Sequence, residues 1–117
     1  MTKAIICGSR DIDSFTLVTL AMHDLIREFD LDITEVISGC ANGVDKLGER
    51  WAMKNFIPIK RFPANWKLHG KAAGPIRNQQ MVDYADITIA ITNGSVGTEH
   101  TIRMSKEKGI PTYVRRI

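Results

Sequence analysis

Short runs of apolar, largely β-branched residues alternate along the chain with longer segments in which apolar side chains recur every three or four positions. The short runs are typical of β-strands, and the longer segments are typical of helices that bury one face. We expect strands at about Lys3–Cys7, Glu35–Ser38, Ile57–Phe62, Ile87–Ile91 and Pro111–Val114.

Helices are expected in the intervals between these strands. The pattern predicts helices at about Ser14–Phe29 and Val44–Asn55. A third helix is expected to carry Pro75 in its first turn, because proline suits the first helical positions. A fourth is expected to be capped by Thr98 and to end at Gly109, since glycine is common just beyond a helix end.

Regular alternation of strand and helix favours βαβ units with right-handed crossovers. The expected fold is therefore a three-layer α/β sandwich, in which a mainly parallel sheet of about five strands is flanked by about four helices. The almost continuous β-branched content of Ile87–Ile91 is typical of a strand covered on both faces. At 117 residues, the chain is expected to form one domain that spans residues 1–117.

Composition places the chain among ordinary globular proteins. Hydrophobic residues make up 44% and charged residues 25% of the chain. No apolar run approaches the roughly 20 residues of a membrane span, and the N-terminus lacks the apolar region of a signal peptide. We therefore expect a cytoplasmic protein without a membrane partner. The net charge of +3 is modest for a dedicated nucleic-acid-binding protein.

The two cysteines indicate neither a metal site nor a disulfide. Cys7 and Cys40 lie on or beside different strands, with no CxxC motif and no clustered histidines. Cys7 is expected to be a small core residue, as cysteine often is. Cys40 lies in a loop that is expected to belong to the site described next.

Four loops with similar chemistry follow the expected strands. They are Gly8–Arg10, Ser38–Gly43, Pro63–Arg77 and Asn93–Thr98. The carboxyl ends of parallel strands meet at one edge of the sheet, and open α/β folds bind ligands at that edge. Small residues, free backbone amides and scattered basic side chains at this edge favour an anion, and we interpret it as a nucleotide site.

Two of these loops carry a specific expectation for phosphate. Arg10 can hold a phosphate with two parallel hydrogen bonds. Gly39 and Gly43 allow the second loop to approach a ligand, and the helix that follows presents its N-terminal amides. Asp45, in the first turn of that helix, either bonds a ribose hydroxyl or caps the helix, and the sequence leaves both alternatives open.

The stretch from Pro63 to Asn78 is expected to be a long loop, and such loops tend to be functional. Trp66 offers a flat face for a base. Arg77 is expected in the first turn of a helix, where a cation opposes the helix dipole unless an anion lies in front of it. Alternatively, the stretch is a covering flap in which Trp66 packs on the core.

The loop at Asn93–Thr98 again leads from a strand into a helix. No lysine follows its last glycine, so the signature of a P-loop ATPase is absent. Glu99 is the one carboxylate beside a glycine turn and is the candidate general base. Taken together, the residues expected to contact the ligand are Gly8, Ser9, Arg10, Ser38, Gly39, Cys40, Ala41, Asn42, Gly43, Asp45, Trp66, Lys71, Arg77, Asn78, Gly94, Ser95, Gly97 and Thr98.

These motifs resemble the YspA-type branch of the SLOG superfamily over nearly the whole chain. The resemblance rests on Gly8-Ser9-Arg10, the SGCANGVD segment at 38–45, the GKAAGPIRN run at 70–78 and Gly94–Thr98. It implies a Rossmann-like fold, a nucleotide or nucleotide-derived signalling ligand that is sensed or sequestered, no other cofactor, and a homo-oligomer. The GKAAGPIRN run is its most specific part.

Two relatives within the superfamily supply alternatives. LOG enzymes are phosphoribohydrolases that cleave the N-glycosidic bond of a nucleoside monophosphate, with a PGGxGTxxE motif. Here Asn93, Ser95 and Thr101 stand at the Pro, second Gly and Glu positions, and Glu99 lies two residues early, which turns a helical side chain by about 200°. DprA-like proteins bind single-stranded DNA, which calls for a basic groove with several aromatics, whereas aromatics make up 7% of this chain.

Overall fold

All five strands lie in one parallel sheet, as the sequence predicts. The computed structural model describes residues 1–117. The sheet order is β3-β2-β1-β4-β5, and every neighbouring pair is parallel. The strands are β1 (Thr2–Gly8), β2 (Ile33–Ser38), β3 (Ile59–Arg61), β4 (Ile87–Thr92) and β5 (Thr112–Arg116).

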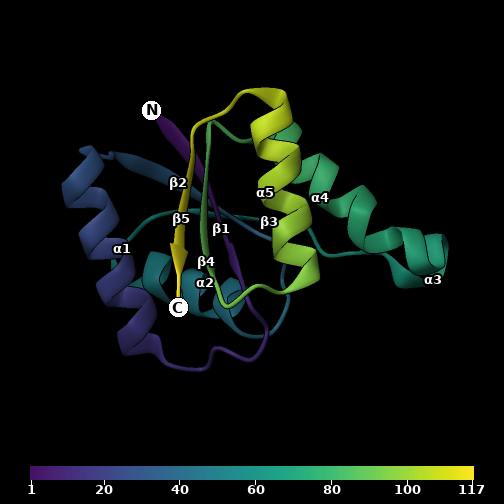
Figure 1. The fold of residues 1–117 in the computed structure, drawn as a ribbon, viewed down its shortest axis with the longest axis horizontal. Helices are drawn as coiled ribbons and strands as arrows, with labels where there is room; N and C mark the ends of the chain where they lie inside the picture. The colour runs from purple at the N-terminus through teal and green to yellow at the C-terminus, as the bar shows by residue number, and fades with distance from the viewer.

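Four long helices cover the two faces of this sheet and complete a Rossmann-like three-layer sandwich (Figure 1). Helices α1 (Phe15–Phe29) and α2 (Val44–Lys54) pack with Ala4 and Ile6 of β1 on one face. Helices α4 (Ala73–Tyr84) and α5 (Val96–Lys108) pack on the other face, against Ile5 and Cys7. Alternate residues of β1 thus enter opposite cores, which is the two-residue period of a strand.

Local signals in the sequence explain where the helices begin and end. The Ser14 hydroxyl accepts a hydrogen bond of 3.1 Å from the Leu17 amide and caps α1. Gly109 adopts the left-handed conformation that ends α5. All six residues of β4 are buried, because the strand lies between two others with helices on both faces. No helix combines the length and apolar character that a bilayer crossing requires.

The stretch expected as a long loop is largely helical, and that prediction was wrong. It forms the short helix α3 (Trp66–His69), a 3₁₀ turn, η1 (Gly70–Ala72), and the start of α4. The Asn65 side chain starts α3 by accepting a hydrogen bond of 3.1 Å from the Leu68 amide. None of the residues in α3 is buried.

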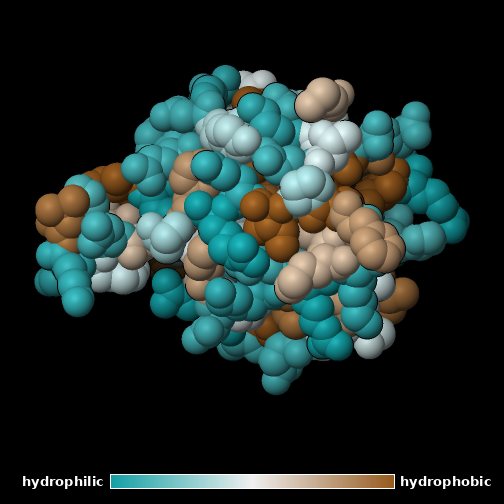
Figure 2. Space-filling view, turned by 180° about the vertical axis from the view of Figure 1, so that it is seen from behind, coloured by the Kyte–Doolittle hydropathy of each residue, from teal (hydrophilic) through white to brown (hydrophobic).

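Segments α3 and η1 form an arm that projects from one end of the molecule (Figure 1). Seen from behind, this projecting end carries hydrophobic atoms (Figure 2), and Leu68 of α3 is 71% exposed. Trp66 is 53% exposed, so it does not pack as a lid on the core. The flap alternative is therefore incorrect in that respect.

Two helix starts also differ from the prediction. Helix α4 begins at Ala73, so Arg77 and Asn78 lie in its second turn and not in its first. Helix α5 begins at Val96 after Ser95, so Thr98 lies within the first turn and is not the cap. In both cases, glycines near the start (Gly74 and Gly97) are incorporated into the helix, although glycine ordinarily disfavours helical structure.

Candidate functional site

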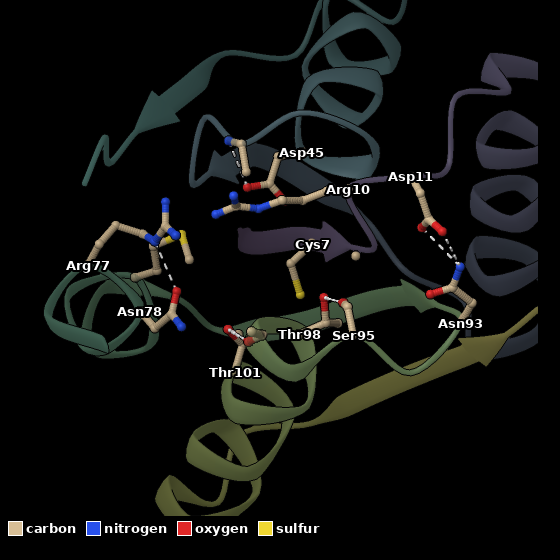
Figure 3. Close-up of a pocket in the computed structure, with 14 residues that line it drawn as sticks. Cys7, Arg10, Asp11, Asp45, Arg77, Asn78, Asn93, Ser95, Thr98 and Thr101 are labelled. Atoms are coloured by element: carbon tan, nitrogen blue, oxygen red, sulfur yellow. Dashed lines mark hydrogen bonds between the residues drawn. The ribbon is translucent and has the colours of Figure 1, made fainter. Parts of the chain in front are cut away.

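A cavity of about 410 Å³ opens at the carboxyl edge of the sheet, between the ends of β1 and β4 (Figure 3). The chain crosses there from the β3 side of the sheet to the β4 side, so the loops after β1 and β4 diverge. This topological switch point is where open α/β sheets bind ligands. The lining residues are Cys7, Gly8, Arg10, Asp11, Ala41, Asp45, Arg77, Asn78, Met81, Asn93, Ser95, Gly97, Thr98 and Thr101.

Buried hydroxyl groups join the loop after β1 to the loop after β4. The Ser9 hydroxyl, fully buried, lies 3.1 Å from the Thr92 hydroxyl and donates to Asn93 Oδ1 at 2.6 Å. It also accepts a hydrogen bond of 2.9 Å from the Asn93 amide. Asn93 Nδ2 donates in turn to the Asp11 carboxylate at 2.9 Å. This wall of the cavity is therefore held in place before any ligand arrives.

Asp45 and Arg77 face each other across Gly39 at the inner end of the cavity. They are 6% and 9% exposed. Arg77 donates through Nη1 to the Gly39 carbonyl and through Nε to Asn78 Oδ1 at 2.9 Å. Asp45 Oδ2 accepts a hydrogen bond of 3.2 Å from the Ala41 amide. Arg77 Nη2 and Asp45 Oδ1 make no hydrogen bond within the protein, and both residues line the cavity.

Burial sets the protonation of the acidic groups here. It raises the pKa of Asp45 to about 6, against the opposing effects of the Ala41 amide and Arg77. Burial also raises the pKa of the Cys7 thiol, which therefore stays protonated at the floor of the cavity, 3.6 Å from the Ile89 carbonyl. Cys7 is thus a core residue, as predicted, and also part of the cavity lining.

Arg10 is the exposed cation of the site. Its guanidinium makes no hydrogen bond or ion pair within the protein, and it lines the cavity together with Arg77. Figure 3 shows it extending across the cavity from the loop after β1. A guanidinium with free donors at a concave, partly buried surface is suited to a phosphate or carboxylate.

Backbone amides complete the opposite wall. The amides of Ser95, Val96, Gly97 and Thr98 have no acceptor in the protein, because they belong to the first turn of α5 and the residue before it. Three of these residues line the cavity. The site thus presents two cations and a run of free N–H donors to the same space, with the positive end of the α5 dipole behind them.

A second cavity of about 540 Å³ adjoins the first, and the two share Arg10, Arg77, Asn78 and Gly97. Trp66 at the base of the arm and residues of α5 surround it. The residues found only in this second cavity are Trp66, Gly74, Pro75, Gly94, Val96, Glu99, His100 and Arg103.

Glu99 is engaged in an ion pair rather than free. Both of its carboxylate oxygens accept hydrogen bonds from Arg116 at the end of β5. These hydrogen bonds hold the pKa of Glu99 below its usual range. A carboxylate with a lowered pKa is a weak base at neutral pH. Its role as general base stays a prediction and requires release from Arg116.

The predicted ligand contacts divide into three groups. Those that line the first cavity are Gly8, Arg10, Ala41, Asp45, Arg77, Asn78, Ser95, Gly97 and Thr98. Those that line only the second are Trp66 and Gly94, and the candidate general base Glu99 lines that cavity as well. Those that line neither are Ser9, Ser38, Gly39, Cys40, Asn42, Gly43 and Lys71. In the third group Ser9 and Ser38 are fully buried, whereas Lys71 is an exposed residue of the arm.

Several lining residues were missed by sequence reasoning. In the first cavity these are Cys7, Asp11, Met81, Asn93 and Thr101, and in the second they are Gly74, Pro75, Val96, His100 and Arg103. A usable signal was present for three of them. Val96, His100 and Arg103 are spaced by four and three residues, which places them on one face of α5.

Comparison with known proteins identifies relatives. The model of the family described as "YspA, cpYpsA-related SLOG family" matches residues 2–69, which is more than half of the chain. The Gene 61 protein of Mycobacterium phage D29 is 36% identical over 118 residues, covering 95% of this chain and 94% of the phage protein. No solved structure matches the chain.

Proposed function

Because the chain belongs to the YspA, cpYpsA-related SLOG family, we propose that it binds a nucleotide or nucleotide-derived signalling ligand at the carboxyl edge of its sheet. On this proposal the protein senses or sequesters the ligand without a required chemical change. One observation carries the proposal: two arginines and three residues with acceptor-free backbone amides, Ser95, Gly97 and Thr98, line a single cavity at the switch point of the sheet.

Phosphate is the group that this arrangement fits best. Arg10 and Arg77 Nη2 supply charged donors, and the amides of Ser95–Thr98 supply neutral ones. A phosphate can accept from both sides at once, because its oxygens point in several directions. Asp45 lines the same cavity, and its carboxylate is suited to a ribose hydroxyl, which donates.

The test starts with the ligand that the native protein retains, identified by mass spectrometry after gentle purification. Calorimetry then measures the affinity of ribonucleoside 5′-mono-, di- and triphosphates. Arg10→Ala is the informative variant, because Arg10 has no partner within the protein and its loss leaves the fold intact. Loss of one charge-assisted hydrogen bond costs about 1.5–3 kcal/mol, so affinity is expected to fall roughly tenfold to a hundredfold.

Arg27→Ala is the matched control, since Arg27 is an exposed arginine of α1 that lines neither cavity. Binding that is unchanged in Arg10→Ala would exclude the proposed phosphate site. Release of free base from a nucleoside monophosphate, abolished by Glu99→Gln, would favour the hydrolase instead. Affinity for single-stranded DNA with a steep salt dependence would favour the DNA-binding alternative.

We also propose a cytoplasmic location and a homo-oligomeric state. Both cysteines are free thiols, as is usual in a reducing compartment. Exposed apolar side chains such as Phe56 and Leu68, and the hydrophobic atoms across the middle of the face in Figure 2, are surfaces that a second copy would cover. Light scattering that gives the mass of one chain, or fractionation outside the cytoplasm, would refute the respective proposal.

A further inference from the structure

The residue that follows the end of α2 combines an unusual backbone conformation with almost complete exposure. The Phe56 amide donates to the Met53 carbonyl at 3.3 Å. The next amide, of Ile57, donates to the Ala52 carbonyl at 2.9 Å. This pattern ends many helices and ordinarily has glycine at the position of Phe56. Phe56 has φ of 57°, which a bulky residue disfavours, and at 95% exposure its ring gains no packing in return.

Phe56 stands at the end of a row of basic side chains on α2. Lys46, Arg50 and Lys54 are spaced by four residues, so they share one face of the helix, and all three are exposed. We call these three residues the basic stripe. Lys46 pairs with Glu49 at 3.9 Å, whereas Arg50 and Lys54 form no ion pair within the chain.

Helix α1 carries the complementary pattern. Leu20, Asp24 and Glu28 are also spaced by four residues and share an exposed face. We call Asp24 and Glu28 the acidic stripe. Leu20, which is 58% exposed, adds an apolar side chain beside it. Glu28 pairs with Arg115 at 3.5 Å, and Asp24 is unpaired.

The two stripes belong to neighbouring helices but do not neutralise each other. Helices α1 and α2 cover the same face of the sheet (Figure 1), and the Arg50 guanidinium lies 4.3 Å from the centre of the Phe15 ring of α1. No ion pair joins the two helices. Arg27 is the only basic residue of α1, and both acidic residues of α2, Asp45 and Glu49, are buried. Each helix therefore presents mainly one sign of charge to solvent.

We propose that the outer face of α1 and α2 joins two copies of this chain about a two-fold axis, with Phe56 and the basic stripe of each copy on Leu20 and the acidic stripe of the other. A two-fold axis that passes between the two helices lays each helix on the opposite helix of the second copy, so the face is complementary to itself. Exposed ion pairs alone contribute little, and an aromatic anchor such as Phe56 is typical of residues that dominate an interface.

This inference rests on the homo-oligomeric state proposed above and specifies the surface that forms it. It is independent of the nucleotide site, because none of the residues named for the contact lines either cavity. Met53, which is 57% exposed and lies beside Lys54, extends the apolar centre of the contact. An apolar centre with a charged rim is the usual anatomy of a protein interface.

Charge reversal tests the contact by sedimentation equilibrium, which should give twice the mass of one chain for wild type. Arg50→Glu with Lys54→Glu reverses the basic stripe, and Asp24→Lys with Glu28→Lys reverses the acidic stripe. Each variant alone should raise the dissociation constant of the dimer at least about tenfold, because like charges then face each other. An equimolar mixture of the two variants should recover the dimer, because opposite charges meet again at both halves of the contact.

The matched control is Lys67→Glu with Lys71→Glu. It makes the same change in net charge on the exposed arm, away from α1 and α2, and should leave the mass unchanged. Raising the salt concentration from about 0.05 M to about 0.5 M should weaken the wild-type dimer, because salt screens the contacts at its rim. A control variant that dissociates as readily as the stripe variants would overturn the inference.

Phe56→Gly separates the contact from the fold. Glycine suits the backbone conformation at this position, so the variant should have a urea midpoint no lower than that of wild type when both are measured at concentrations where wild type is monomeric. The same variant should raise the dissociation constant of the dimer at least about tenfold. Dimerisation equal to wild type would place Phe56 outside the contact and overturn the inference.

The remaining outcomes distinguish this inference from the other proposals. A dimer that neither stripe variant weakens, or a mass that grows beyond two chains, would overturn it and leave the homo-oligomer standing. A wild-type chain that stays monomeric would overturn both. A monomer that binds single-stranded DNA through the basic stripe would identify a nucleic-acid surface instead. Calorimetry of Arg10→Ala reports on the nucleotide site separately, and its failure would leave this contact standing.

Discussion

Two strand-to-helix turns that look alike in the sequence differ in what surrounds their glycines. In the turn between β2 and α2, a methyl group added at Gly39 would lie 2.8 Å from both Arg77 Nη1 and Asp45 Oδ2. In the turn between β4 and α5, nothing lies within 4 Å of the corresponding positions at Gly94 and Gly97. The β2–α2 turn packs against other parts of the protein, and we call it the packed turn. The β4–α5 turn opens onto the cavities, and we call it the open turn.

The backbone amides show the same difference. In the β2–α2 turn, the amides of Cys40 and Ala41 bond to side chains within the turn, and the Val44 amide bonds to the Ser9 carbonyl. In the β4–α5 turn, the four successive amides of Ser95–Thr98 remain without acceptors. Glycine in such a motif therefore marks a close approach, but only the structure tells whether protein or ligand approaches.

The largest effect is expected from Gly43→Ala, which tests the packed turn. Gly43 has φ of +79°, and a methyl group there would collide with the Ser9 carbonyl and lie 2.6 Å from Arg10 Cα. Backbone strain and overpacking together should lower the free energy of unfolding by about 4 kcal/mol. Urea denaturation followed by circular dichroism measures this. A loss below about 1 kcal/mol would mean that this turn is no more tightly packed than the other.

The next largest expected effect is a pH dependence of the free energy of unfolding, which arises from Asp45 in the packed turn. Asp45 has a folded-state pKa of about 6, above its ordinary 3.8. The folded protein therefore binds this proton more tightly than the unfolded chain, and the contribution to stability is greatest below about pH 4 and is lost as the pH rises through 6. The total is up to about 3 kcal/mol.

Asp45→Asn isolates that contribution, because the amide oxygen can still accept from Ala41. Relative to wild type, the variant should gain stability between pH 4 and pH 7, as measured by urea denaturation. Burial raises the pKa of Glu49, but hydrogen bonds from Ser38 and Arg61 hold that pKa below its usual range. The pH dependence of stability that Glu49 causes is common to both proteins and cancels in the comparison. If the stability of the variant and of wild type changes in parallel with pH, the pKa of Asp45 is not raised in the folded protein.

A smaller effect is expected in the open turn from Gly94→Ala. The φ of +101° is strained for any residue with a side chain, but no atom is close enough to collide. The expected loss is about 1.5 kcal/mol, again from urea denaturation. If the loss equals that of Gly43→Ala, the contrast between the two turns does not hold.

The smallest effect on stability is expected from Gly97→Ala, with the opposite sign. Gly97 lies in the first turn of α5 without a positive φ, so alanine should stabilise the protein by about 0.5–1 kcal/mol. A ligand that approaches these amides would meet the new methyl group, and its affinity should fall about tenfold. A variant that is more stable and binds equally well would show that the ligand does not approach the open turn.

The sequence predicted the sheet and its helices well, because local signals specify them. The β-branched run at Ile87–Ile91 and the glycine at Gly109 are recognisable without any tertiary information. The prediction of a long loop at 63–77 was wrong, because Gly70, Gly74 and Pro75 resemble loop residues. The Asn65 cap starts a short helix locally, and Gly74 and Pro75 lie in the first turn of α4.

The site was predicted at the level of loops but not of individual contacts. Arg10 and Arg77 were identified, but the burial of Arg77 depends on the Gly39 carbonyl, which lies 38 residues away. His100, which lines the second cavity, was not identified, and its hydrogen bond to Asn78 depends on an amide that Arg77 orients. Hydrogen bonds between distant loops leave no periodic trace in a sequence.

The pairing of β1 with β4 has a consequence for how the protein folds. Ala4 is in register with Ile87, so the first strand waits for a partner that emerges from the ribosome some eighty residues later. Until then β1 has an unpaired edge that can join other chains, and such long-range pairing is intrinsically slow. Heating or overexpression should therefore produce aggregates nucleated by the amino-terminal half. A molecule that holds its ligand between the β1 and β4 loops has already paired these two strands.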